Sequence, residues 1–228
     1  MTHLRPVDPH ARIAGVLYLV TFAASIPAAF WFLTPVLDDP SYVLRGGSDT
    51  RVVIGCLLDV VNAIACVGTA VALFPLVRRH HESLALGFVT SRLFEAAVIA
   101  VGVTSLLGVV GLHRDVTEGS GATRTDLLAS QQALVAVRDA TFQLGPNLCA
   151  AMNALLLGTL LYRSRLVPRG LPAVGLVGAP LLLAATVATL LGVIDQGSPW
   201  FAGALLVAAW ELGLGLHLTF RGLRPATR

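Results

Sequence analysis

The sequence contains no lysine, few charges and few cysteines, and each shortage excludes a class of protein. Charged residues occupy 13% of the 228 positions and hydrophobic residues 55%, whereas soluble domains carry charge at about a quarter of their positions. The mean hydropathy is +0.77. This composition excludes a soluble protein with a large core and favours an integral membrane protein.

The basic residues are arginines without exception, 16 of them against 13 acids. A sequence pI of about 9.1 would suit a nucleic-acid-binding protein, but the arginines are dispersed at the ends of apolar stretches and form no basic face. We therefore expect no nucleic-acid partner. Basic residues at loop ends are expected of membrane topology.

The sequence also lacks the common motifs for metals and nucleophiles. Cys56, Cys66 and Cys149 lie in apolar runs, their number is odd, and no C-x-x-C occurs, which argues against a disulfide framework. Neither H-E-x-x-H nor G-x-S-x-G is present, so the usual zinc and serine-hydrolase templates do not apply. We predict no metal and no cofactor, and assign no catalytic residue.

Long apolar stretches recur along the chain, each able to cross about 30 Å of hydrocarbon as a helix. They predict an all-α fold, a six-transmembrane-helix bundle that makes residues 1–228 a single integral membrane domain. The predicted spans lie near residues 12–33, 52–76, 84–112, 144–162, 171–194 and 200–220. The first is longer than a usual signal peptide core and has no clear cleavage site, so we expect it to be retained.

Arginine counts predict how the bundle is oriented. With the N-terminus inside, ten arginines lie in cytoplasmic segments and five lie outside. The outer five are Arg45, Arg51, Arg114, Arg124 and Arg138. This asymmetry predicts that both termini are cytoplasmic.

An amphipathic segment, residues 126–143, precedes the fourth span. Two arrangements fit it. In one, the segment lies in the membrane interface with Leu134, Val137 and Phe142 in lipid and Gln131, Arg138 and Asp139 in water. In the other, it runs straight into the fourth span, with a kink at Pro146.

Six polar residues lie inside the predicted spans and form the candidate site. An ionisable side chain at the centre of a membrane helix costs about 2.5–3.5 kcal/mol on insertion scales and usually faces the interior of the bundle. Counted from the span ends, the ionisable ones lie about 10–16 Å deep. The candidate ligand-binding cluster is Asp59, Asn62, Arg92, Glu95, Asn153 and Glu211. Small residues flank most of these positions and would let the helices approach closely.

Three interpretations of this cluster remain open. Three carboxylates against Arg92 leave a nominal charge of −2, which a proton, a small cation or a cationic or amphiphilic ligand would relieve. Binding or passage of such a ligand is the leading interpretation. The alternative is a structural or regulatory membrane protein in which the charges only pack, and the third is a membrane-embedded enzyme acting on lipid. The partners expected are the lipid bilayer and that small ligand.

Several blocks resemble a known family. ARIAGVLYLV near the start, SRLFEAAV in the third span and YRSRLVPRGLPAVGLVGA before the fifth are similar to the bacterial multi-pass membrane proteins catalogued as domain of unknown function 4386. The most distinctive block is the turn from Ser164 to Arg169. The resemblance covers nearly the whole chain and implies a multi-pass protein of the inner (cytoplasmic) membrane. It implies no activity.

Overall fold

The structure, a computed structural model, describes residues 8–45, 48–119, 121–195, 198–199 and 202–224. It is 86% helical, and no strand occurs in the part it describes. Six helical stretches are long and apolar enough to cross a membrane, which confirms the predicted all-α fold with six spans. They are Pro9–Phe32, Asp49–Val77, Glu82–Thr117, Arg124–Ser164, Gly170–Leu190 and Ala202–Phe220. The sixth was predicted to begin at residue 200, which, with residue 201, lies outside the described residues.

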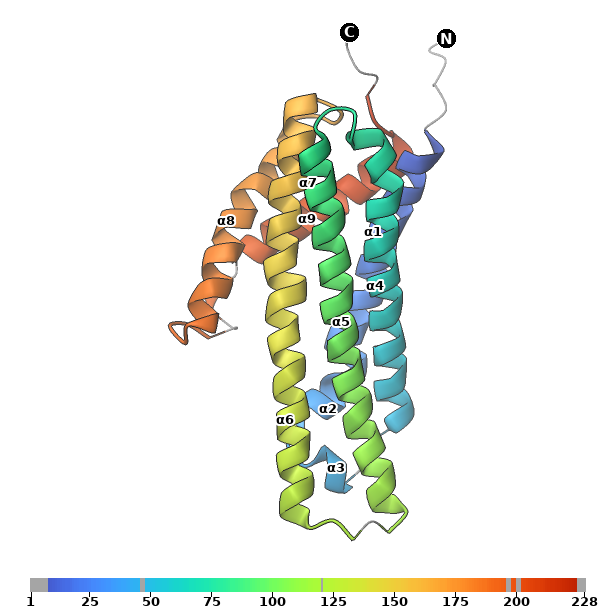
Figure 1. Cartoon of the computed structure of the whole chain (residues 1–228), viewed down its shortest axis with the longest axis vertical. Coiled ribbons are helices and arrows are strands. Elements are labelled where there is room, and N and C mark those ends of the chain that lie inside the picture. Colours follow the sequence, from blue (N-terminus) through green and yellow to red (C-terminus); the bar gives the residue numbers. More distant parts are fainter. Residues whose placement is uncertain (1–7, 46–47, 120, 196–197, 200–201, 225–228) are drawn as a thin grey trace.

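These stretches are built from nine α-helices and two π-helical segments within the described ranges. Helices α1 (Pro9–Pro27) and η1 (Ala28–Phe32) are followed by the short α2 (Thr34–Asp38) and α3 (Tyr42–Arg45). Then come α4 (Asp49–Val77), α5 (Glu82–Thr117), α6 (Arg124–Phe142), η2 (Gln143–Cys149), α7 (Ala150–Ser164), α8 (Gly170–Leu190) and α9 (Ala202–Phe220). Figure 1 shows the long helices side by side, with α8 at one side and α9 crossing behind the bundle from α8 toward α1.

Side-chain caps and prolines explain where several helices begin and bend. The Asp8 carboxylate accepts hydrogen bonds from the first turn of α1, and Ser48 and Thr123 cap α4 and α6 in the same way, which satisfies N–H groups that lack a helical partner. Pro27 directly precedes η1, and Pro146 lies inside η2. Proline removes one helical hydrogen bond, and a wider π turn lets the helix continue past it.

The fourth span begins earlier along the chain than predicted. It begins at Arg124 rather than near residue 144 and runs unbroken to Ser164, so of the two arrangements for residues 126–143 the second is right. The polar face of α6 points into the protein: Gln131 and Arg138 are buried, whereas Val137 is 42% exposed. The interfacial arrangement, with Gln131 and Arg138 in water, is wrong because both side chains find protein partners.

The short helices α2 and α3 close one end of the bundle, which we call the cap end. Gln131 of α6 holds them from inside, because its Oε1 accepts the Val43 N–H at 2.8 Å and its Nε2 donates to the Asp39 carbonyl at 2.7 Å. The backbone N–H and the hydroxyl of Ser41 both donate to the Asp39 carboxylate and lower its pKa. Burial and a hydrogen bond to Asp49 raise the pKa of Tyr42.

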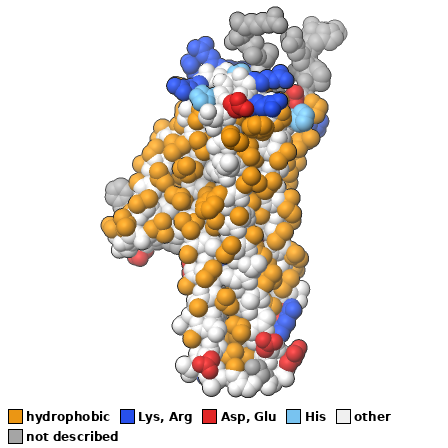
Figure 2. All heavy atoms as spheres, in the orientation of Figure 1, with side chains coloured by type: hydrophobic (Ala, Val, Ile, Leu, Met, Phe, Trp, Pro, Cys, Tyr) orange, Lys and Arg blue, Asp and Glu red, His pale blue; other side chains and the backbone are white. Residues whose placement is uncertain are grey.

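The opposite end carries both described chain ends, and we call it the terminal end. Figure 2 shows hydrophobic side chains over the middle of the visible face and charged ones gathered at the two ends of the bundle. Helix α8 packs against α7 and α9 (Figure 1). The α8–α9 contact is very close, because a Cβ added at Gly203 would lie 2.5 Å from the Leu182 nitrogen.

Two apolar clusters fill the bundle, one toward each end. The terminal-end cluster includes Leu73 of α4 and Phe88 of α5. The cap-end cluster includes Val52 of α4 and Val103 of α5. Along α4 and α5 the residues between these two clusters include Asp59, Asn62, Arg92 and Glu95. A polar layer therefore separates the two halves of the core.

Candidate functional site

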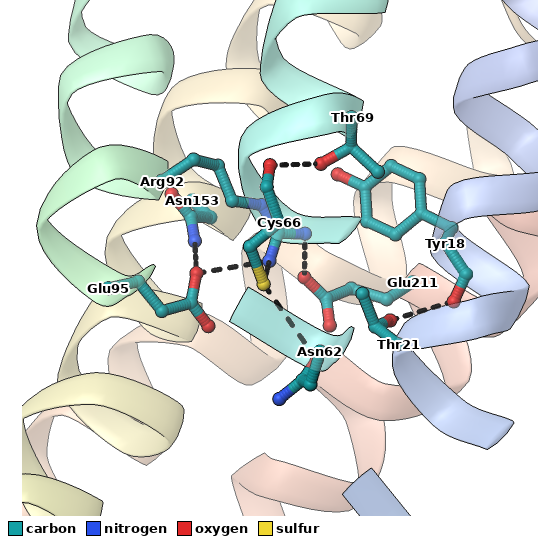
Figure 3. A network of polar contacts seen from close by, with 9 residues as sticks. All are labelled: Tyr18, Thr21, Asn62, Cys66, Thr69, Arg92, Glu95, Asn153 and Glu211. Atoms are coloured by element: carbon teal, nitrogen blue, oxygen red, sulfur yellow. Dashed lines mark hydrogen bonds and ion pairs between the residues drawn. The ribbon is translucent and has the colours of Figure 1, made fainter. Parts of the chain in front are cut away.

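Arg92 is the centre of the polar layer. Its side chain is 2% exposed, and its guanidinium pairs with a carboxylate on each side. Nη1 lies 3.0 Å from Oε2 of Glu95, one turn further along α5, and Nη2 lies 3.0 Å from Oε1 of Glu211 on α9 (Figure 3). Arg92 and Glu95 thus face the bundle interior, as the cost of charge in lipid predicts.

Aromatic rings and a thiol surround the same guanidinium. The Arg92 Cζ lies 5.0 Å from the centroid of the Tyr18 ring and 5.8 Å from that of Phe88, within the range of cation–π attraction. Its Nη1 also lies 3.4 Å from the sulfur of Cys66. Four helices therefore fix one side chain, and the close α1–α9 approach at Gly15 and Gly215 places Glu211 within its reach.

Asn153 of α7 supports Glu95 from outside the cavity. Its Nδ2 donates to Oε2 of Glu95 at 2.8 Å, and the residue is fully buried (Figure 3). Asn153 was among the predicted site residues, and its side chain lies in the polar layer. Its own Oδ1 has no hydrogen-bond partner among the described residues.

Asp59 of α4 pairs with an arginine that was not among the predicted site residues. Oδ2 of Asp59 lies 3.4 Å from Nη2 of Arg138 on α6, and each side chain is 10% exposed. The Arg138 guanidinium also lies over the Phe142 ring, with its Cζ 5.2 Å from the centroid. Two signals in the sequence pointed to Arg138: Asp59 had no partner of its own, and Gln131, Arg138 and Thr141 recur on one helical face.

A cavity of about 450 Å³ joins the two ion-paired groups. Of the six predicted residues, Asp59, Asn62, Arg92, Glu95 and Glu211 line it, together with Arg138, and Asn153 does not. With three carboxylates and two guanidiniums at the cavity, the nominal charge is −1. The predicted −2 was too negative because Arg138 was not among the predicted site residues.

The cavity presents hydrogen-bonding groups that the protein leaves free. Oε1 of Glu95, Oε2 of Glu211 and Oδ1 of Asp59 accept no hydrogen bond from a described residue. Nε of Arg92 and Nε of Arg138 are buried and find no acceptor in the described part of the chain. Free oxygens on acidic groups attract a positively charged group.

The remaining wall of the cavity reaches the outer surface of the bundle and is mostly apolar, apart from Thr21, Ser25, Thr141 and Asn147. Three of the hydrophobic side chains that line it are strongly exposed: Ile26 at 44%, Phe30 at 71% and Leu205 at 74%. They belong to the first and sixth spans. We call the charged part of the cavity its floor; its residues are Asp59, Arg92, Glu95, Arg138 and Glu211. A molecule that enters from the bundle surface therefore reaches the floor past side chains of the kind that face lipid.

The geometry offers little to a metal ion. Among the residues that the structure describes, no three His, Cys, Asp or Glu side chains gather closely enough to hold one. Cys66, the thiol nearest the floor, lies against the Arg92 guanidinium. Charge pairing and hydrogen bonding are what this arrangement supplies.

Comparisons with known proteins place the chain in a family. Neither curated proteins nor solved structures gave a match. The family described as "Domain of unknown function (DUF4386)" matches residues 13–222, nearly the full length and all six spans, in agreement with the resemblance of its sequence blocks. The chain belongs to the DUF4386 family.

Proposed function

We propose that this membrane protein binds a lipophilic cation, a molecule with an apolar body and one positively charged group, in the central cavity. The observation that carries the proposal is a cavity with a charged floor of nominal charge −1 and a mostly apolar wall that reaches the bundle surface. Its volume of about 450 Å³ falls in the range of small-molecule sites, roughly 300–1,000 Å³.

The two regions of the cavity suit the two parts of such a ligand. A positively charged group would be attracted to the carboxylates of Glu95, Glu211 and Asp59, which outnumber the two arginines at the cavity by one. An apolar body would lie along Phe30 and Leu205, whose exposure opens a route from the bilayer. Entry from lipid keeps the body of the ligand out of water.

The packing-only alternative is less well supported. A cluster that only fixes helix positions needs paired charges and has no use for an open volume beside them. Arg92 is paired in that way, but Asp59 and Glu211 line a cavity large enough for a ligand. We therefore propose binding as the primary role.

We also propose that the protein lies in the inner (cytoplasmic) membrane of a bacterium with its terminal end in the cytoplasm. The support is that most of the described arginines outside the spans lie at the terminal end. They belong to the α4–α5 turn, the α7–α8 turn and the segment after α9. Arg138 was counted among the five arginines on the outer side, but it is buried in the bundle. Without it, the excess of arginines at the terminal end is larger, and this excess is what the orientation rule uses.

The experiment uses tetraphenylphosphonium as the probe and the purified chain in phosphatidylcholine nanodiscs. Binding is measured by equilibrium dialysis, with tetraphenylsilane as an uncharged compound of the same shape. We expect Glu211→Gln to weaken tetraphenylphosphonium binding about tenfold, as the loss of one charge contact worth roughly 1.4 kcal/mol implies. The control is Glu118→Gln, which removes an exposed carboxylate outside the cavity.

Two results would contradict the proposal. Equal affinity of the Glu211→Gln and Glu118→Gln variants for tetraphenylphosphonium would show that the floor does not contact the cation. Equal binding of the uncharged compound would show that the cavity selects only for apolar shape.

A further inference from the structure

We propose a second site, at the terminal end, that binds the phosphate group of an anionic phospholipid. The turn between α7 and α8 and the segment after α9 meet there around a hollow of about 410 Å³. Arg165, Pro168, Arg169 and Arg224 line this hollow, which we call the arginine hollow. It includes the Ser164–Arg169 block of the sequence and is independent of the central cavity.

The backbone holds these arginines in place. The N–H of Arg224 donates to the Leu166 carbonyl at 2.8 Å and ties the segment after α9 to the turn. Leu166 and Val167 are buried in the terminal-end cluster. The Arg169 guanidinium lies over the Tyr162 ring, with its Cζ 5.0 Å from the centroid. The turn and the segment after α9 are thus fixed to the packed core, which places the three exposed arginine side chains around the hollow.

Arg165 occupies a backbone position that normally favours glycine. Its φ of 57° and ψ of 21° place it in the left-handed region at the end of α7. Glycine and, less often, asparagine are the usual residues there, because a Cβ makes the conformation unfavourable. Here the chain has an arginine, whose side chain lines the hollow. A role for that side chain would explain why the strained residue is not a glycine.

The charge of the hollow has no counterpart within the described protein. No described carboxylate forms an ion pair with Arg165, Arg169 or Arg224. Guanidinium groups bind phosphate oxygens through paired N–H donors, so a phosphate would relieve the repulsion between the three cations. The observed arrangement therefore calls for an anion.

The position of the hollow selects a lipid as the source of that phosphate. It lies between Ser164, where the fourth candidate span ends, and Gly170, where the fifth begins. The end of a span is the depth of the lipid headgroups. An anionic phospholipid can place its phosphate there while its acyl chains remain beside the helices.

The test compares lipid binding by native mass spectrometry of the full chain released from detergent micelles. The lipids are dioleoyl phosphatidylglycerol and, as the reference, dioleoyl phosphatidylcholine. We expect preferential retention of phosphatidylglycerol, reduced about fivefold by each of Arg165→Gln and Arg224→Gln, as about 1 kcal/mol per arginine near an anionic headgroup implies. Arg79→Gln is the matched control, because Arg79 is exposed at the same end but does not line the hollow.

Three outcomes decide the matter. Selective loss in the two hollow variants supports the site, and Arg224→Gln alone suffices if Arg165→Gln does not fold. An equal loss in Arg79→Gln overturns it in favour of diffuse attraction to the whole basic end. In a thermal-shift series, stabilisation by free inorganic phosphate equal to that by phosphatidylglycerol overturns the lipid assignment.

Discussion

Replacing Arg92 by methionine is the most direct test of the polar layer. Methionine fills much of the same volume but removes the charge that Glu95 and Glu211 share at 3.0 Å each. A hydrogen bond to a charged group contributes about 1.5–3 kcal/mol, and removing one partner of a buried ion pair costs about 3–5 kcal/mol because the other charge stays buried. We expect Arg92→Met to lower the free energy of unfolding by about 3–5 kcal/mol.

The assay is reversible unfolding in mixed micelles of dodecyl maltoside and sodium dodecyl sulfate, followed by circular dichroism. Arg114→Met is the control, since Arg114 forms an ion pair with Asp49 at 3.4 Å but its side chain is 60% exposed. Exposed pairs contribute about 0–1 kcal/mol. If Arg92→Met destabilises no more than Arg114→Met, the buried charges are not compensated by Arg92 and the reasoning fails.

A double variant separates charge from packing in the same assay. Adding Glu211→Gln to Arg92→Met removes one of the two carboxylates that the first change left unpaired. We expect the double variant to be more stable than the sum of the two single changes predicts, by about 0.5–3 kcal/mol, the usual coupling between contacting residues. Additive effects would mean that Arg92 and Glu211 do not interact across α5 and α9.

Three further predictions concern the fold. Gly203→Ala should lower the unfolding free energy by about 1–3 kcal/mol, because its Cβ would meet α8 backbone at 2.5 Å, whereas Gly111→Ala, with nothing within 4 Å, should be neutral or slightly stabilising in the same assay. Gln131→Ala should speed amide hydrogen exchange in α3, measured by mass spectrometry, because the Val43 N–H loses its acceptor, and Gln132→Ala, an exposed neighbour, should not. A C-terminal fusion should fluoresce with green fluorescent protein and be inactive with alkaline phosphatase, as a cytoplasmic terminus requires.

Each of these predictions has an outcome that contradicts it. Equal stability of the Gly203→Ala and Gly111→Ala variants would mean that α8 and α9 are not in backbone contact. Unchanged exchange in Gln131→Ala would mean that the cap end is held by other contacts. An active phosphatase fusion would reverse the proposed orientation.

The sequence predicts the spans and much of the polar layer because lipid leaves few choices. A long apolar run must form a helix to satisfy its backbone groups in the bilayer, and a charge within it must turn away from lipid. Depth along each span then predicts which charges can meet. Arg92, Glu95 and Glu211 come together in the structure for this reason.

Arg138 shows where this reasoning stops. An amphipathic helix has a polar face whether that face meets water or the inside of a protein, so the pattern of α6 alone does not distinguish the two. The contact with Asp59, 79 positions away along the chain, depends on tertiary packing. Gln131 is a second case. Its side-chain amide forms hydrogen bonds with the backbone of Val43 and Asp39, which lie in a segment without long apolar runs. The polar face of α6 that contains Gln131 is periodic in the sequence, but the pattern does not identify Val43 and Asp39 as the partners of its amide.

The division of the core into two apolar clusters has a consequence for permeability. Each cluster packs buried apolar side chains against one another, one on either side of the polar layer. A continuous file of water would have to pass both, and narrow apolar constrictions exclude water and ions. The charges of the layer are therefore insulated from both aqueous compartments along the bundle axis. The bundle can thus contain a charged cavity within the membrane without providing a path for ions to leak across it.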